Sequence, residues 1–507
     1  MAASVPSPEE RTPDNVARGV IRFVLDGEVI RVQDPPATLT VLEFLRERLG
    51  RCGTKEGCAE GDCGACTVVL GELDENESGG GDRMRYRAIN SCIRYLPTID
   101  GKELVTVESL AESATHLHPV QQAMVDKHAS QCGFCTPGFV MSLFALYLDN
   151  AAPHREDVVE ALSGNLCRCT GYRPIIDAGC TMSGYPEPPR WGRADAARPE
   201  RVQLLKDIRR RRALHLPGFF APRSIEELAD AFAAAPHSLL LAGGTDVGLW
   251  TTKHLRDLPP IIYLGEVAEL QHIDLSNGQL RIGAAVTLTD AWDAIVAEHL
   301  ELAELALRFG SPPVRNSGTL CGNIANGSPI GDAMPALIAL NAHVELRCGE
   351  RTRELALEDF YLGYQRKALD PGEFVAAVTV PARHSEVALA SYKWSKRVDQ
   401  DISAVCAAFA LRIDDGLVAS ARIAFGGMAA VPARARHAEA VLVGQPWNST
   451  TVESAVAALA QDFTPITDMR ASAEYRLRAA GNFLRRFFLE HSGQTRTLRT
   501  HAVEIPG

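Results

Sequence analysis

Residues 57–66 read GCAEGDCGAC, and this short stretch carries the strongest structural signal in the chain. Its thiols, Cys58, Cys63 and Cys66, follow a C-x4-C-x2-C pattern with glycines beside and between them. This spacing is the one with which plant-type proteins bind a [2Fe–2S] cluster through thiolates. Glycine lets the backbone wrap closely around such a cluster and turn N–H groups toward its anionic sulfurs. The stretch therefore predicts an iron–sulfur site.

A fourth ligand is needed, and Cys92, after the next pair of predicted strands, is the natural candidate. The alternatives are a zinc site or a set of buried free thiols. Zinc usually takes paired C-x2-C units, so a triple-cysteine loop with a distant fourth thiol fits zinc poorly. Cys52, just before the loop, is expected to be a spare, packed thiol.

A second cysteine set follows in the next block of sequence. Cys132 and Cys135 form a C-x2-C pair at a predicted helix start, and Cys167 and Cys169 form a C-x-C pair at a predicted helix end. The partial positive charge of a helix N-terminus helps to hold an anionic cluster. Taken alone, these four thiols suit zinc equally well, but the neighbouring first set favours a second cluster.

The surrounding patterns predict the domain organisation. Residues 20–33 suit a hairpin that turns at Asp26-Gly27, and Thr40 suits a helix cap. With the strand that follows the cysteine loop, they predict a small β-rich domain over 20–107. Strand signals then disappear, and residues 108–182 predict an all-α domain.

Three segments are expected to lack regular structure. Residues 1–19 are rich in Pro, Ser and charge and predict a disordered tail. Residues 76–82 predict an exposed loop, because they are rich in Gly, Ser and acids. Residues 183–215, with several prolines and the run Arg209–Arg212, predict a linker.

A glycine-rich turn, LAGGTDVG at 241–248, follows an apolar strand. Adjacent glycines let backbone N–H groups approach a diphosphate, and Thr245 adds a hydroxyl donor. A tight strand-to-helix turn also needs glycine, so the pattern alone does not decide between the two roles. Strands alternate with helices from 216 to 383, and longer strands with a final basic amphipathic helix follow over 384–507.

Composition excludes some functions. The net charge of −11 argues against binding to nucleic acid or to an anionic membrane surface. No stretch has the length of a membrane span, and the first residues lack the apolar core of a signal peptide. The expected location is the cytoplasm, where thirteen cysteines are more often metal ligands than disulfides.

Longer motifs now identify a family. The segments QCGFCTPG at 131–138 and GNLCRCTGY at 164–172 resemble the proximal-cluster motifs of the molybdenum hydroxylases, and residues 53–67 resemble their distal-cluster loop. The resemblance implies a ferredoxin-like β-grasp domain followed by an all-α [2Fe–2S] bundle. It also implies that the proximal cluster lies next to molybdopterin and the distal cluster nearer the flavin.

The resemblance extends to a flavin domain of the vanillyl-alcohol-oxidase (PCMH) type. Its FAD loop corresponds to Leu241, Ala242, Gly243, Gly244, Thr245, Asp246, Val247 and Gly248. The chain after about 386 resembles the C-terminal domain of the carbon monoxide dehydrogenase flavoprotein, through residues 425–427, Pro432 and residues 470–476. The implied fold class is multidomain α+β.

Further FAD contacts are implied by the same resemblance. Phe309 is expected near the flavin, Thr319 and Asn323 on the diphosphate side, and Asp332 at a sugar hydroxyl. Lys393 and Val375 complete the expected site. The alternatives are that Asp332 only caps a helix and that Lys393 is solvated. Cys321 stands where the family usually has glycine, which would strain the backbone if that position required a positive φ.

Within the family, an iron–sulfur and FAD chain that ends before any molybdenum domain is similar to the small subunits of bacterial xanthine dehydrogenases. The resemblance implies a molybdopterin-binding large subunit, two small plus two large chains, and oxidation of hypoxanthine and xanthine to urate on the partner. Electrons would then pass through both clusters and FAD to NAD. The flavin ring would be the reactive group, with no catalytic side chain on this chain.

Two other functions stay open. One is the same electron-transfer role in a related hydroxylase that acts on an aldehyde or an N-heterocycle. The other is a non-enzymatic iron–sulfur or zinc scaffold with a vestigial flavin fold.

Overall fold

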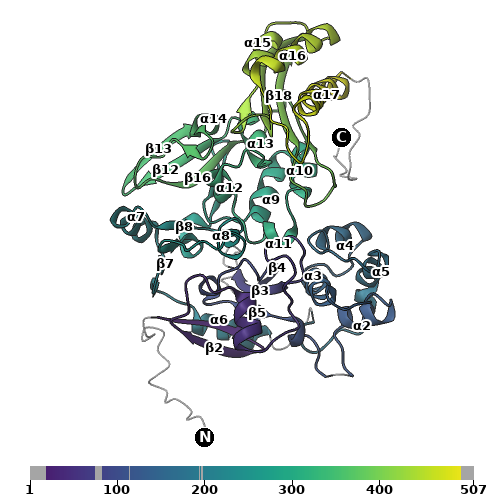
Figure 1. The fold of residues 1–507 in the computed structure, drawn as a ribbon, viewed down its shortest axis with the longest axis vertical. Coiled ribbons are helices and arrows are strands. Elements are labelled where there is room, and N and C mark those ends of the chain that lie inside the picture. The colour runs from purple at the N-terminus through teal and green to yellow at the C-terminus, as the bar shows by residue number, and fades with distance from the viewer. Residues whose placement is uncertain (1–18, 75–82, 114, 193–194, 196–197, 493–507) are drawn as a thin grey trace. The chain divides into compact units, whose positions relative to one another are not determined.

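The structure is a computed structural model that describes residues 19–74, 83–113, 115–192, 195 and 198–492 (Figure 1). The expected tail, apart from Gly19, and the expected loop at 76–82 lie outside the described residues. The chain divides into two compact units. Unit 1 comprises Met1–Leu228, His237–Val267 and Pro312–Ser317, and unit 2 comprises Ala229–Pro236, Ala268–Ser311 and Gly318–Gly507.

Unit 1 begins with a five-stranded sheet in the order β2-β1-β5-β3-β4. Its strands are β1 (Val20–Leu25), β2 (Glu28–Gln33), β3 (Thr67–Asp74), β4 (Arg83–Asn90) and β5 (Glu103–Val105). The predicted hairpin is confirmed: Asp26 and Gly27 both have positive φ, 57° and 84°, as a type I′ turn requires. Strand β1 also pairs in parallel with β5, which gives the β-grasp topology expected for a ferredoxin-like domain.

A short helix before the cysteine loop shares a core with this sheet. Helix α1 (Val41–Glu43) begins at Thr40, whose hydroxyl accepts the backbone N–H of Glu43 at 3.1 Å. The Glu43 carboxylate in turn accepts the backbone N–H of Thr40 at 2.8 Å, which completes a capping box. The predicted cap is therefore confirmed, although the helix continues as a π-helical turn over Phe44–Arg48.

Four helices form the second part of unit 1, and Figure 1 shows them gathered beside the sheet. They are α2 (Pro119–Asp126), α3 (Thr136–Asp149), α4 (Arg155–Ala161) and α5 (Arg173–Thr181). Helix α3 is the core of this bundle, because Phe139, Met141, Leu143 and Phe144 are fully buried. The same helix packs against β3, so the bundle and the sheet share an interface.

The expected linker over 183–215 is wrong for residues 198–208, which form helix α6 (Arg198–Ile208). Its Val202, Leu205 and Ile208 pack on Val24 and Met84 of the first sheet. The helix also buries Arg201, which lies 2.7 Å from Asp195 and 3.6 Å from Glu103. A buried arginine weakens the apolar pattern in the sequence, and its carboxylate partners cannot be predicted from local spacing.

A small second sheet carries the glycine-rich turn, and it belongs to unit 1. It has the order β6-β7-β9-β8, with β6 (Leu214–Leu216), β7 (Phe219–Ala221), β8 (Leu239–Leu241) and β9 (Ile261–Tyr263). Strands β7, β9 and β8 are parallel, and the turn after β8 leads into α8 (Val247–Thr252). Leu241 and Tyr263 are buried in one core with residues of the first sheet, such as Phe23 and Val68.

Unit 2 contains a five-stranded antiparallel sheet and the helices around it. The sheet order is β10-β11-β16-β12-β13, with β10 (Ile273–Ser276), β11 (Gln279–Gly283), β12 (His343–Cys348), β13 (Arg351–Ala356) and β16 (Phe374–Pro381). The main helices are α9 (Leu288–Glu298), α12 (Leu320–Asn326) and α13 (Ala333–Ala339).

A second sheet in unit 2 forms the C-terminal part of the chain. Its order is β17-β18-β19-β20, with β17 (Val387–Trp394), β18 (Val405–Asp414), β19 (Leu417–Gly426) and β20 (Ala433–Arg434). Helices α15 (Arg436–Leu442), α16 (Ser449–Asp462) and α17 (Ala473–His491) pack on it (Figure 1). Phe487 of α17 stacks on Phe409. Among the described residues, no helix combines the length and apolar character that crossing a membrane requires.

Candidate cofactor sites

The structure brings the four cysteines of the first set together in two pairs. The sulfurs of Cys66 and Cys92 lie 3.3 Å apart, and both residues are buried. Cys58 and Cys63 form the second pair, in which each backbone N–H lies 3.3 Å from the other residue's sulfur. Two pairs of thiols suit the two irons of a [2Fe–2S] cluster, each of which takes two protein ligands. Among the described residues, no group of three or more His, Cys, Asp or Glu side chains is placed to hold a single metal ion.

The loop around these thiols stabilises negative charge on sulfur. The backbone N–H of Glu60 points to the Cys58 sulfur at 3.4 Å, beside that of Cys63. A hydrogen bond from the Cys63 thiol and these N–H groups, acting against burial, lower the pKa of Cys58 to about 5. The thiolate is the form that binds metal, so these groups favour the ligand state at Cys58, whereas the hydrogen bond to Cys58 and burial raise the pKa of Cys63.

Position 57 of the loop has room only for glycine. A Cβ at Gly57 would lie 2.7 Å from the Cys63 sulfur, closer than side chains approach one another. Cys52, in contrast, is exposed and lies outside the set, so the expectation of a packed thiol at this position is wrong. The path of the chain decides this exposure, since the preceding helix changes to a π-helical turn and ends at Arg48. The residue type alone gave no signal for it.

We expect Cys92→Ser to remove one of two electron paramagnetic resonance signals of the reduced protein and to leave the other. Serine lacks the soft sulfur ligand that holds the second iron of this set. Iron content should fall from about four to about two per chain. Cys52→Ser is the matched control and should change neither signal. Loss of both signals in Cys92→Ser, or of either in Cys52→Ser, would contradict the assignment of ligands.

The four cysteines of the second set also lie in two pairs. Cys135 is the N-cap residue of α3, so the C-x2-C pair lies at a helix start, as predicted. Its thiol lies within hydrogen-bonding reach of Cys167, and that of Cys132 within reach of Cys169. The C-x-C pair does not lie at a helix end as predicted, since α4 ends at Ala161 and both cysteines occupy the connection to α5.

A residue that was not predicted holds this connection. The Tyr172 hydroxyl accepts the backbone N–H of Cys167 at 3.0 Å, and Thr170 donates its backbone N–H to the Cys167 sulfur at 3.5 Å. Tyr172 itself has a φ of 67°, which is uncommon for a residue with a side chain. The local motif therefore fixes the direction of the sulfur before α5 begins.

The two cysteine sets touch within unit 1. The backbone N–H of Leu166, next to Cys167, donates to the carbonyl oxygen of Cys63 at 3.0 Å. Phe134, between Cys132 and Cys135, approaches Gly57 of the first loop. Sequence spacing could not place the sets relative to each other, because they belong to different blocks of the chain.

The glycine-rich turn lies against the first cysteine set. Gly244 has a φ of 76°, and Gly248 packs so closely that a Cβ would lie 2.7 Å from that of Ile93, next to Cys92. Thr252 of α8 donates to the carbonyl of Ala59 at 2.7 Å. Tyr95 donates its hydroxyl to the carbonyl of Val247 at 3.2 Å. Within unit 1, the first cysteine set thus contacts both the second set and the turn.

In unit 2, the structure joins two predicted flavin contacts to each other. Lys393 Nζ lies 2.8 Å from Asp332 Oδ2, and both residues are buried. Ser403 donates to Asp332 Oδ1 at 2.6 Å, and Lys393 donates to the carbonyl of Arg308 at 2.9 Å. The alternative of a solvated Lys393 is therefore wrong. Asp332 stands at the N-cap of α13, but its side chain makes no capping hydrogen bond.

The other predicted contacts in unit 2 lie on α12, on β16 and beside Trp292. Thr319 caps α12 by accepting the N–H of Gly322 at 3.0 Å. Asn323 Oδ1, on the same helix, is buried without a hydrogen-bond partner, so a ligand hydroxyl or N–H would satisfy it. Val375 is buried on β16, and the Phe309 ring lies 5.6 Å from that of Trp292.

Cys321 does not strain the backbone. It lies in α12 and is absent from the residues with positive φ, so the expected cost at this position does not arise. Its sulfur is fully buried and lies 3.7 Å from the carbonyl of Ile282. The thiol therefore acts as a small core side chain.

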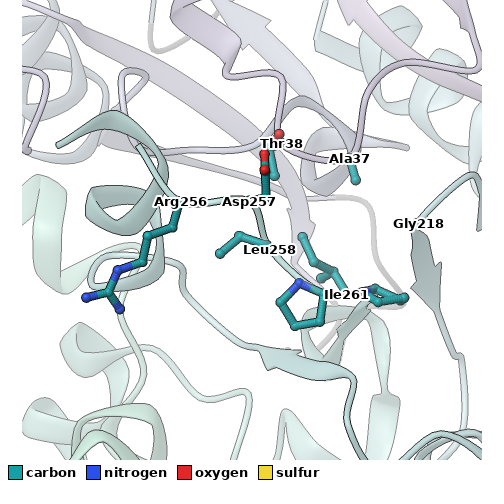
Figure 2. Close-up of a pocket in the computed structure, with 9 residues that line it drawn as sticks. Ala37, Thr38, Gly218, Arg256, Asp257, Leu258 and Ile261 are labelled. Carbon is teal, nitrogen blue, oxygen red and sulfur yellow. The ribbon is translucent and has the colours of Figure 1, made fainter. Parts of the chain in front are cut away.

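A separate pocket of about 290 Å³ lies on unit 1 (Figure 2). It is lined by Ala37, Thr38, Gly218, Arg256, Asp257, Leu258, Pro259, Pro260 and Ile261. None of these residues belongs to the cysteine sets or to the glycine-rich turn, and we assign the pocket no part in cofactor binding.

Four family models match the chain, in the order in which the domains were predicted. Residues 23–96 match the 2Fe-2S iron-sulfur cluster binding domain, and 106–180 match the [2Fe-2S] binding domain. Residues 212–383 match the FAD binding domain in molybdopterin dehydrogenase, and 390–491 match the CO dehydrogenase flavoprotein C-terminal domain. The domains thus define an iron–sulfur flavoprotein, and the predicted multidomain α+β class, two [2Fe–2S] clusters and FAD are confirmed.

Individual relatives narrow the class. The xanthine dehydrogenase of Emericella nidulans is 31% identical over 92% of this chain, which spans 38% of that protein's length. The carbon monoxide dehydrogenase structure from Hydrogenophaga pseudoflava, which lacks the Mo-pyranopterin moiety, is 29% identical, with a TM-score of 0.50 over 53% of this chain and 94% of that one. Quinoline 2-oxidoreductase from Pseudomonas putida 86 is 25% identical, with a TM-score of 0.50 over 54% of this chain and 96% of that one. The chain belongs to the molybdenum hydroxylase family of oxidoreductases, as predicted.

Proposed function

We propose that this chain carries electrons from a molybdopterin-containing partner subunit, through two [2Fe–2S] clusters and FAD, to NAD during oxidation of hypoxanthine and xanthine to urate. One observation supports the order of transfer. In unit 1, the first cysteine set contacts the second set through the Leu166–Cys63 hydrogen bond and the glycine-rich turn through the Gly248–Ile93 contact.

The residues of this chain hold and insulate the cofactors rather than transform a substrate. Clusters of this type exchange single electrons, whereas FAD accepts single electrons and releases a hydride to NAD. The eight cysteine thiolates bind the clusters, and loop N–H groups offset their negative charge. FAD is proposed to contact the turn at 241–248, together with Phe309, Thr319, Asn323, Asp332, Val375 and Lys393.

The surface at the second cysteine set fits a protein partner. Cys132 and Cys169 are exposed, and the apolar side chains of Phe134 and Leu166 beside them are 46% and 41% exposed. Exposed apolar groups around a redox site favour docking of a second protein, which would exclude water from the transfer route. One polypeptide of a carbon monoxide dehydrogenase matches, over 94% of its length, about half of this chain. Members of the family therefore distribute their domains over polypeptides in different ways.

Finer points of the proposal follow from the same resemblance. We propose an assembly of two of these chains with two large subunits, and a location in the reducing cytoplasm. The proposed domain limits are 20–107, 108–182, 216–383 and 384–507. The quinoline 2-oxidoreductase match favours one alternative, in which the partner oxidises another N-heterocycle and this chain keeps the same role.

The proposal is tested with the full chain, alone and with the molybdenum subunit that co-purifies with it. Alone, the chain should bind both clusters and FAD and reduce a dye with NADH, but it should not oxidise xanthine. With the partner, xanthine-dependent NAD reduction should appear. Cys135→Ser should abolish that reduction and leave NADH–dye activity largely intact, because only the entry end of the route is broken.

The outcomes separate the proposed functions. Xanthine turnover by the isolated chain would refute the division of labour. Turnover of an aldehyde or another N-heterocycle, but not of xanthine, by the assembled enzyme would establish the alternative substrate class. A colourless purified protein that contains zinc would support the zinc scaffold, because zinc sites do not absorb visible light.

A further inference from the structure

A buried side-chain amide lies where the two cysteine loops meet. Asn165 is only 3% exposed, and its Nδ2 donates to the carbonyl of Gly64 at 3.2 Å. Its Oδ1 accepts the Ser142 hydroxyl of α3 at 2.7 Å. One amide therefore joins the first cysteine loop, the second cysteine loop and the helix that begins at Cys135.

The next residue makes the direct link between the two sites. Leu166 donates its backbone N–H to the carbonyl of Cys63 at 3.0 Å, and Cys167 follows it. Cys63 and Cys167 are proposed ligands of different clusters. The route from one sulfur to the other thus consists of covalent bonds and a single hydrogen bond.

A glycine fixes the same junction from the side of α3. A Cβ at Gly138 would lie 2.1 Å from the carbonyl oxygen of Gly64 and 3.3 Å from the Cα of Ala65. Only glycine allows this approach, because the neighbouring atoms are backbone and cannot move aside cheaply. Helix α3 carries Cys135 at its N-cap, so this contact also sets the distance between the two cysteine sets.

We infer that Asn165 and Gly138 are positioning residues that set the electronic coupling between the two clusters, and this inference rests on the proposed function. One electron passes from the cluster of the second set, which is oxidised, to the cluster of the first set, which is reduced. No proton or bond is exchanged in this step. The two residues hold the Leu166–Cys63 hydrogen bond in place as the crossing point.

An ordinary structural role predicts something different. If Asn165 and Gly138 only stabilised the fold, their replacement would lower the unfolding midpoint and leave the properties of fully loaded protein unchanged. The Gly64 carbonyl also accepts the hydroxyl of Thr67 at 2.7 Å, so it keeps a partner when Asn165 is replaced. Cluster binding should therefore survive in Asn165→Ala.

The test is made on the isolated full chain, without a partner. In reduced wild-type protein, the magnetic interaction of two neighbouring paramagnetic clusters should split their resonance signals at low temperature. Asn165→Ala and Gly138→Ala should keep four irons per chain but lose or narrow this splitting. After mixing with NADH, the signal of the second cluster should appear more slowly than in wild type, while that of the first keeps its rate.

Matched controls lie in the same helical bundle. Asn150 bonds Asp157 at 3.2 Å, away from both cysteine sets, and Gly179 is crowded, since a Cβ there would lie 2.6 Å from the Val158 side chain. Asn150→Ala and Gly179→Ala should keep the wild-type splitting. The milder Asn165→Ser serves if Asn165→Ala loads poorly, since its shorter side chain cannot span the junction.

The results separate this inference from the proposed function. Wild-type protein is expected to show two interacting signals. If it does, and the loaded Asn165 and Gly138 variants keep the same splitting and the same transfer rate, the inference alone is overturned. A wild-type protein with one signal, or none, would overturn the proposed function as well. Equal loss of splitting in the control variants would also overturn the inference, because it would show a general effect of destabilisation.

Discussion

Gly243→Val is expected to give a protein that keeps both iron–sulfur centres but loses nearly all of its bound flavin. The turn at 241–248 follows β8, and its backbone N–H groups are expected to face the diphosphate. A branched side chain in this turn would occupy the space that the diphosphate needs. Because both cysteine sets lie on other segments, their clusters should be unaffected. Flavin released by denaturation, together with iron content, measures the outcome.

Two further variants make this prediction specific. Gly184→Val is the control, because Gly184 has open space around it in unit 1 and an ordinary φ, and it should retain flavin. Gly248→Val should lose flavin and also alter the signal of the first cluster, since its side chain would collide with Ile93, next to Cys92. Normal flavin content in Gly243→Val would show that the turn has only a structural role.

Local sequence patterns predicted the parts of this protein that depend on local chemistry. The Asp26-Gly27 turn and the cap at Thr40 need only neighbouring residues, and both are present. The cysteine spacings predicted two sets of thiols, and the structure assembles both. The long family motifs added the order of domains, which four family models bear out.

Features that depend on distant partners were missed. Helix α6 buries Arg201 against Asp195 and Glu103, and no local pattern marks such a helix as packed. Asn165 reads as one polar residue in a motif, and its role at the junction depends on Gly64, far away in the chain. The exposure of Cys52 likewise follows from the path of the chain and not from residue type.

The contact between Lys393 and Asp332 was also not predicted from the sequence. The resemblance assigned both residues to the flavin, whereas the structure joins them to each other. When both residues of an ion pair are buried, the pair stabilises the fold only while both residues are charged. Removing one partner leaves an uncompensated charge and costs roughly 3–5 kcal/mol. Each residue therefore stabilises the fold of unit 2 while the other is charged, whatever it contributes to FAD.

Lys393→Met is accordingly expected to lower the free energy of unfolding by about 3–5 kcal/mol, because Asp332 would lose its charged partner and keep the hydrogen bond from the Ser403 hydroxyl. Urea unfolding of the full chain, with hydrogen exchange in β17 and β18 to localise the change to unit 2, measures this loss. Asp332→Asn combined with Lys393→Met should recover part of it, since the double variant buries no unpaired charge.

The control is Lys396→Met, a substitution of an exposed lysine, which should change the free energy of unfolding by no more than about 0.5 kcal/mol. A loss in Lys393→Met as small as in the control would contradict a compensated buried pair. Recovered stability without recovered flavin in the double variant would then assign Lys393 or Asp332 a direct contact with FAD, separate from its part in the fold.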